Sequence, residues 1–316
     1  MRTDRITGAL LGLACGDALG APAEFMSQAQ LQSHWGELTE MVGGRPWAPG
    51  EWTDDTGMAL CVAKGILACP NDPVEETGRH FLDWGSMAKD VGGTVRAALS
   101  AYRGDWAAAS RSTPQARAGR AAGNGSLMRT LPVALAYADP AAMLRTSARL
   151  SAMTHWDPQA EVCCALYCLW VRALLEERPL HDAWHLAWEA ARAAADLGPL
   201  APDTPGPAPL PAGFWERLAA VEAKSYEQLQ PSGYAGYVVE CLEAAAWCCL
   251  NAGTLEEVLV LAVNLGGEAD TIAAVAGGIA GAAWGHGALP ARWLQKLHHR
   301  AYIEETAERL ARLRSM

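Results

Sequence analysis

The sequence predicts a mostly helical protein. Half of its residues are apolar (51%), and alanine, the strongest helix former, is abundant. Val and Ile rarely fall in the alternating runs that are typical of strands. Apolar residues recur instead at helical spacing, and several of these runs follow Thr, Asp or Pro residues of the kind that begin helices.

Length and charge narrow the classes of function. The chain has 316 residues, which exceeds one average domain without requiring two. Its net charge of −10 argues against binding to nucleic-acid backbones, which requires a basic face, but permits an acidic metal site. The nine Cys include the adjacent pairs Cys163-Cys164 and Cys248-Cys249, both inside apolar helical patterns. We expect reduced, mostly buried thiols and a cytoplasmic protein.

The first predicted helix runs from about Arg5 to Leu19. Apolar residues occur nearly all round it, which indicates a buried helix. Its apolar run is short and is flanked by Asp4 and Asp17, which argues against a signal peptide. No run of about 18 strongly apolar residues occurs, so we expect no membrane span.

Two adjacent carboxylates begin the second strongly apolar helix, which extends through Leu67. In Trp52–Thr56, Thr53 can cap this helix, and Asp54 and Asp55 then lie in its first turn. The simplest interpretation is that the two acids complement the helix dipole.

A similar acidic helix start occurs near the other end of the chain. Gly266–Thr271 supplies Glu268, Asp270 and a threonine hydroxyl ahead of the apolar run Ile272–Trp284. Each acidic start is generic by itself, but the two together could converge on hard cations, which bind several oxygen ligands.

The middle of the chain contains a possible phosphate-binding loop. A turn at Asn71–Pro73, a helix through Trp84 and a loop at 89–94 come first, and residues 115–122 also read as a loop. Gly123–Arg129 then combines small residues with Asn124 and Ser126, so its backbone N–H groups could hold a phosphate. The loop matches neither a Walker nor a Rossmann pattern, and a plain turn remains the alternative.

The remaining segments contain one notable histidine and one proline-rich loop. Asp157 caps a core-like helix, Ala160–Leu175, and His155 lies just before it; a lone His is more often structural than a ligand. Proline crowds residues 197–213, which we interpret as a surface loop. A domain linker is rejected, because a shared acidic site requires both sides of this loop to pack together. Gly233–Tyr237 then leads into a helix through Trp247.

These segments, in this order, resemble the ADP-ribosylglycohydrolase family. Each motif is modest, but the ordered set is specific and spans almost the whole chain: Gly8–Phe25, Trp52–Met58, Asp90–Thr94, Gly123–Pro132, Thr154–His155, Gly236–Trp247 and Gly266–Gly281. The resemblance implies one compact all-α domain over residues 1–316. It also implies two Mg²⁺ or Mn²⁺ ions at the centre of that domain.

The resemblance carries over to site residues position by position. It implies the metal ligands Thr53, Asp54, Asp55, Glu268, Asp270 and Thr271. It also implies ADP-ribose contacts from Asn124, Gly125, Ser126, Met128 and His155. Asp55, Asp90 and Glu24 are the candidate catalytic acids. Asp17 matches a family acid, which we interpret as structural.

Glu268 departs from the family pattern, which usually reads Gly-Asp-x-Asp-Thr. In the first alternative, which we favour, the backbone at Glu268 moves back so that the longer Glu268 side chain still coordinates a metal ion. In the second, the Glu268 side chain turns away and one ion is held weakly.

The expected activity is hydrolysis of an ADP-ribosyl bond on a protein or a small molecule. An arginine linkage is the first choice, and a serine or other O-linkage is the second. Two alternatives from other classes remain open. One is an inactive, ADP-ribose-binding or crystallin-like member, and the other is a two-metal hydrolase of a nucleotide or a small ADP-ribosylated metabolite. The oligomeric state cannot be predicted from the sequence.

Overall fold

The protein is described here by a computed structural model that covers residues 2–206, 209–229 and 236–316. Those residues form α-helices and short 3₁₀ segments, and they contain no β-strand. The all-α fold class is therefore confirmed. The α-helices are α1 Arg2–Gly20, α2 Gln28–Trp35, α3 Asp54–Ala68, α4 Val74–Gly85, α5 Gly93–Ala101, α6 Trp106–Arg111, α7 Pro114–Arg117, α8 Leu131–Ala136, α9 Pro140–Ala152, α10 Pro158–Leu175, α11 Leu180–Asp196, α12 Phe214–Ala219, α13 Val238–Asn251, α14 Leu255–Asn264, α15 Ala269–Trp284, α16 Ala291–Lys296 and α17 Arg300–Arg314. The 3₁₀ segments are η1 Ala21–Ala23, η2 Asn124–Ser126, η3 Val221–Ala223, η4 Tyr226–Leu229 and η5 His286–Ala288.

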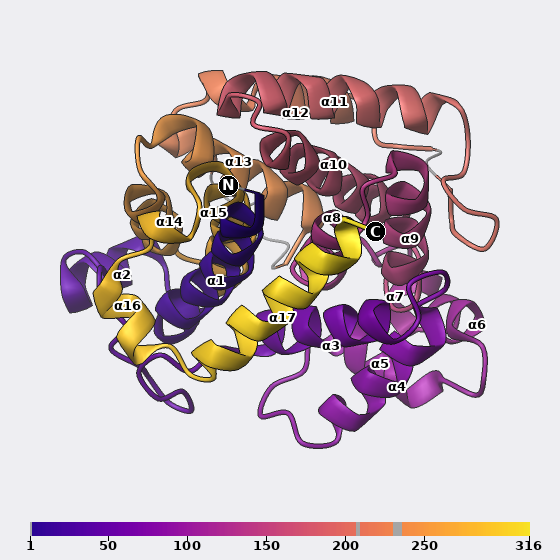
Figure 1. Cartoon of the computed structure of the whole chain (residues 1–316), viewed down its shortest axis with the longest axis horizontal. Coiled ribbons are helices and arrows are strands. Elements are labelled where there is room, and N and C mark those ends of the chain that lie inside the picture. Colours follow the sequence, from indigo (N-terminus) through magenta and orange to yellow (C-terminus); the bar gives the residue numbers. More distant parts are fainter. Residues whose placement is uncertain (1, 207–208, 230–235) are drawn as a thin grey trace.

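Helices α1 and α15 lie side by side near the centre, although they come from opposite ends of the chain (Figure 1). Small residues bring their backbones together: a Cβ atom added to Gly12 would lie only 2.2 Å from the Gly277 carbonyl oxygen. A Cβ added to Gly20 would lie 2.4 Å from the Asp270 Cα atom. The two helices are therefore antiparallel, and the end of α1 fixes the beginning of α15, where the second acidic start lies.

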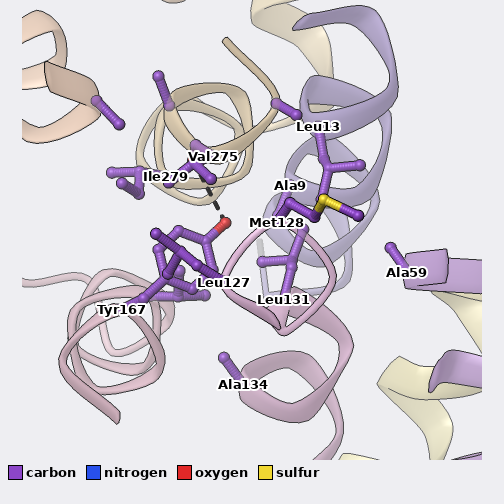
Figure 2. Packing of buried hydrophobic residues seen from close by; sticks show 14 of the residues in the cluster. Ala9, Leu13, Ala59, Leu127, Met128, Leu131, Ala134, Tyr167, Val275 and Ile279 are labelled. Carbon is purple, nitrogen blue, oxygen red and sulfur yellow. Dashed lines mark hydrogen bonds between the residues drawn. The ribbon is translucent and has the colours of Figure 1, made fainter. Parts of the chain in front are cut away.

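One hydrophobic core surrounds this pair of helices. Ala9 and Leu13 of α1 lie close to Val275 of α15, and Tyr167 of α10 points toward the same helix (Figure 2). The Tyr167 hydroxyl donates to the Val275 carbonyl oxygen at 3.3 Å, which satisfies a polar group that would otherwise be buried unpaired. Figure 1 places α11 and α12 along one edge of the molecule, and α4 and α5 at the opposite edge.

Helix α1 is buried along most of its length, as the sequence predicts. By length and composition alone the segment Arg2–Ala23 could cross a membrane, but 89% of its apolar window is packed inside the protein. The predicted caps also occur: the Thr53 side chain accepts from the Asp55 N–H, and Asp157 accepts from the Gln159 N–H.

Local comparison with the sequence prediction shows both differences and agreement. Helix α2 was not predicted, and α7 replaces part of the loop expected at residues 115–122. The expected proline-rich loop at 197–213 contains no α-helix where it is described, and its residues 207–208 lie outside the described part. Gly233–Ala235, expected to lead into the next helix, also lie outside the described residues, whereas α13 begins soon afterwards at Val238.

Candidate active site

Asp17 of α1 holds the beginning of α3 in place. One of its carboxylate oxygens accepts from the Thr53 N–H at 2.9 Å. The other accepts from the Thr56 N–H at 2.9 Å and from the Thr56 hydroxyl at 2.6 Å. Asp17 is fully buried, and both oxygens are used to cap the first turn of α3. This geometry supports the structural role assigned to Asp17 from the sequence.

The two acidic helix starts converge at one buried point. Asp55 of α3, Asp270 of α15 and Asp17 each place an oxygen within 4.8 Å of the other two. The Thr271 hydroxyl donates to Asp55 Oδ1 at 3.3 Å, across a separation of 216 residues in the sequence. Burial, reinforced by the neighbouring acids, raises the pKa values of Asp55 and Asp270 well above their ordinary value.

One oxygen of this cluster has no partner. Asp55 Oδ2 is buried and makes no hydrogen bond with any described residue. A buried carboxylate oxygen is costly to leave unpaired, and a cluster of carboxylate and hydroxyl oxygens is the donor set that Mg²⁺ and Mn²⁺ prefer. The residues present therefore fit a hard divalent cation.

Three further acids surround the cluster. Asp54 Oδ2 accepts from the Gly92 N–H at 3.3 Å, and burial together with the nearby Asp90 raises the pKa of Asp54 to about 7. Burial and the charges of Asp90 and Glu268 raise the pKa of Glu24 to about 8. The structure thus brings Glu24, Asp54 and Asp90 into one acidic region, whose carboxylates would be stabilised in their charged form by a cation.

Glu268 lies at the edge of this region and faces the Gly123–Ser126 loop. Its Oε2 atom accepts from Asn124 Nδ2 at 3.3 Å, and Glu268 is not part of the three-carboxylate cluster. Burial raises its pKa, and the Asn124 hydrogen bond opposes that shift. Of the two alternatives that the sequence left open, this geometry corresponds to the side chain turned away from the aspartates. It also connects the loop directly to the acidic region.

The loop itself presents backbone donors. The Asn124 N–H is already used, because it donates to the Gly236 carbonyl oxygen at 2.7 Å. The Gly125 N–H group has no acceptor among the described residues, whereas the Ser126 N–H lies in the single turn of the 3₁₀ segment η2. The Ser126 hydroxyl accepts from Ser151 at 2.9 Å, and the side chain is buried.

His155 lies directly beneath the loop. A Cβ atom added to Gly125 would lie 2.9 Å from His155 Cε1, and one added to Gly123 would lie 3.1 Å from His155 Nε2. Glycine is therefore required at position 125 because the imidazole occupies the adjacent space. Met128, also expected to contact ADP-ribose, is only 4% exposed, and its side chain lies in the hydrophobic core (Figure 2).

A cavity of about 580 Å³ adjoins the acidic region. Its lining includes Phe25, Tyr237, Cys241 and Glu268. Phe25 is 68% exposed and has a left-handed backbone conformation with φ of 62°, which is uncommon for a bulky residue. A second cavity of about 330 Å³ contains none of the predicted site residues.

Comparison with known proteins identifies the family. A family model described as ADP-ribosylglycohydrolase matches residues 1–316. The chain belongs to the ADP-ribosylglycohydrolase family. The resemblance inferred from the ordered motifs is thereby confirmed, and the protein is assigned as a glycohydrolase enzyme.

Individual relatives of this family match over most of their length. The chain is 32% identical to an ADP-ribosylarginine hydrolase of Pseudomonas putida, with 97% of this chain and 78% of the relative covered. It is 30% identical to the ADP-ribosyl-[dinitrogen reductase] glycohydrolase of Rhodospirillum rubrum, with 93% and 90% covered. A solved structure titled "ADP-ribosylglycohydrolase-related protein complex" superposes with a TM-score of 0.80 at 34% identity, and 99% of each chain is covered.

Two features of this glycohydrolase site were not found from the sequence. The Gly92 N–H that contacts Asp54 lies in a loop whose position depends on tertiary packing. Arg129 lies buried behind the Gly123–Ser126 loop and contacts Thr154. A single arginine inside the apolar stretch 127–136 was the available signal, because a cation in such a position needs buried partners.

Proposed function

We propose that the protein is a divalent-cation-dependent hydrolase that cleaves the glycosidic bond between ADP-ribose and an arginine side chain. The observation that carries this proposal is the convergence of Asp55 and Asp270 at one buried point, with Asp55 Oδ2 left unpartnered. Such a cluster is unfavourable without a cation, because several buried carboxylates repel one another.

The cations would be held by Asp54, Asp55 and Asp270, with the oxygens of Thr53 and Thr271 beside them. Divalent ions in such a site orient a ribose diol and acidify a water molecule. Asp17 keeps the first turn of α3 in register, so it acts on the site through the position of the Asp54-Asp55 pair.

The ADP-ribosyl group would be bound by the loop. The unpaired N–H group of Gly125 suits an oxygen of a diphosphate, and His155 lies directly beneath this loop. This donor is neutral, so it binds an anion without an additional Lys or Arg in a net-acidic protein. Binding at this remote point would orient the distal ribose over the acidic cluster.

Charge favours arginine as the leaving group. Asp90 and Glu268 face one region, where their charges raise the pKa of Glu24, and Asp90 also raises the pKa values of Asp54 and Glu268. A guanidinium group is attracted to such a region, whereas a serine hydroxyl is neutral and gains nothing comparable. The same negative field would stabilise positive charge that develops on the anomeric carbon. Two relatives at 30% and 32% identity are named ADP-ribosylarginine hydrolases, which agrees with this preference.

The test is release of ADP-ribose from defined conjugates. The protein is incubated with ADP-ribosylarginine or ADP-ribosylserine, with Mg²⁺, with Mn²⁺ or with chelator, and free ADP-ribose is measured by chromatography. We expect release from the arginine conjugate that is lost with chelator and in Asp55→Asn. Glu189→Gln, which alters an exposed acid on α11, is the matched control and should behave as wild type. Faster release from the serine conjugate would overturn the linkage. Binding of ADP-ribose without release from either conjugate would favour an inactive family member.

A further inference from the structure

A chain of buried hydrogen bonds runs beneath the phosphate loop from Arg129 through Thr154 to His155. Arg129 Nη2 donates to the Thr154 hydroxyl oxygen at 2.7 Å and to the Leu150 carbonyl oxygen at 3.0 Å. The Thr154 oxygen lies 2.8 Å from His155 Nδ1. Arg129, Thr154 and His155 are each no more than 2% exposed.

Arg129 is a buried cation that has no carboxylate partner among the described residues. Its other neighbours are the Met58 sulfur at 3.9 Å and the Phe81 ring, whose centroid lies 4.6 Å from the guanidinium carbon. Burial lowers the pKa of Arg129 to about 10, so it stays charged at neutral pH. Since a guanidinium can only donate hydrogen bonds, the Thr154 oxygen must be the acceptor in their contact.

This contact determines which nitrogen of His155 carries the proton. The Thr154 hydroxyl has one proton, and among the described residues the only acceptor within reach is His155 Nδ1. If Nδ1 carried a proton instead, the hydroxyl proton would be buried without an acceptor. The imidazole is neutral, because burial and the nearby Arg129 charge lower its pKa to about 3. Its single proton therefore belongs on Nε2.

The Nε2 atom is available for a ligand. It has no hydrogen-bond partner among the described residues, although the side chain is only 2% exposed. It lies against the loop backbone, 3.1 Å from the place that a Gly123 Cβ atom would occupy and 3.2 Å from the corresponding place at Gly125. The Nε2 atom is not itself among the buried unpartnered atoms of the described residues, so an acceptor supplied by a ligand can reach it at this point.

We propose that Arg129 and Thr154 are positioning residues that hold His155 as the Nε2–H tautomer, so that its ring donates to a phosphate oxygen of the bound ADP-ribosyl group. The identity of this ligand rests on the function proposed above. Tautomer choice matters because ionised phosphate oxygens only accept hydrogen bonds, so a bare Nε2 would repel the ligand whereas Nε2–H attracts it.

The tautomer can be measured directly. Two-bond ¹H–¹⁵N spectra of the ¹⁵N-labelled full chain distinguish protonated from bare ring nitrogens, and His155→Asn identifies the His155 signals by their disappearance. We expect the proton on Nε2 in the wild type and in Thr154→Ser, which keeps the hydroxyl. Thr154→Val removes the hydroxyl at similar size, and we expect a mixture of tautomers and about tenfold weaker ADP-ribose binding by calorimetry.

Each result decides one part of the proposal. A proton on Nδ1 in a wild type that binds ADP-ribose overturns the positioning role and leaves the proposed function standing. An unchanged tautomer and an unchanged affinity in Thr154→Val also overturn it. If Thr154→Val does not fold, the wild-type spectrum still decides the tautomer. A wild type that binds no ADP-ribose overturns the proposed function together with the role of the donor.

Discussion

The contact between α1 and α15 predicts that Gly12→Ala destabilises the protein. The added Cβ atom would lie 2.2 Å from the Gly277 carbonyl oxygen and 3.0 Å from its carbonyl carbon, so the two helices would have to separate. Overpacking of this kind costs about 3 kcal/mol when rigid backbone lies on both sides. Replacing a helical glycine by alanine recovers about 1 kcal/mol of that cost. We therefore expect a net loss of about 2 kcal/mol in the free energy of unfolding.

Urea unfolding followed by circular dichroism measures this loss. Gly287→Ala is the matched control, because a Cβ atom there would meet nothing within 4 Å. Its free energy of unfolding should stay within about 0.5 kcal/mol of the wild type. Because Asp270 begins the displaced helix, Gly12→Ala should also weaken Mn²⁺ binding. A Gly12→Ala protein as stable as the Gly287→Ala control, with unchanged Mn²⁺ affinity, would refute the packing explanation.

Three further predictions concern the site. The folded-state pKa values of Glu24 (about 8) and Asp54 (about 7) exceed their unfolded values, so the native state binds more protons than the unfolded state does. The metal-free protein should therefore lose stability as the pH rises from about 4 to about 8. Urea unfolding measures this, and a free energy of unfolding that rises across that range would contradict the prediction. Gly125→Ala should weaken ADP-ribose binding about tenfold, because the new methyl group displaces His155. Calorimetry measures this affinity, and an affinity equal to that of the wild type would contradict the prediction. Because Glu268 accepts from Asn124 and lies outside the three-carboxylate cluster, Glu268→Ala should leave Mn²⁺ affinity close to that of the wild type. A strong loss of affinity in a titration would show that Glu268 turns from Asn124 to coordinate.

Helix starts could be predicted where the signal is local. Thr53 and Asp157 cap their helices as the sequence predicts, because a cap depends on neighbouring residues only. Helix α2 was missed although Ser27 and Gln30 form a capping box, because the segment is polar and buries only Leu31. Periodicity therefore gives no signal there, and a capping box without an apolar face does not by itself predict a helix.

The convergence of the two acidic helix starts, those of α3 and α15, could be predicted only as a hypothesis. Each acidic helix start is a common feature by itself. That the two meet depends on α1, which contacts α3 through Asp17 and α15 through Gly20. Side-chain directions could not be predicted at all. Ser126 contacts Ser151 and Glu268 faces Asn124 because of packing between segments distant in the sequence. Arg129 likewise required the structure, since its partner Thr154 lies 25 residues away.

The most direct test of the central claim is a Mn²⁺ titration of Asp55→Asn, Asp270→Asn and the double variant, followed by electron paramagnetic resonance. If Asp55 and Asp270 share one cation site, each single variant loses high-affinity Mn²⁺ binding, and the double variant loses no more than either single variant does. Wild-type Mn²⁺ binding in either single variant, or losses that add in the double variant, would show that the two acidic helix starts do not form one site.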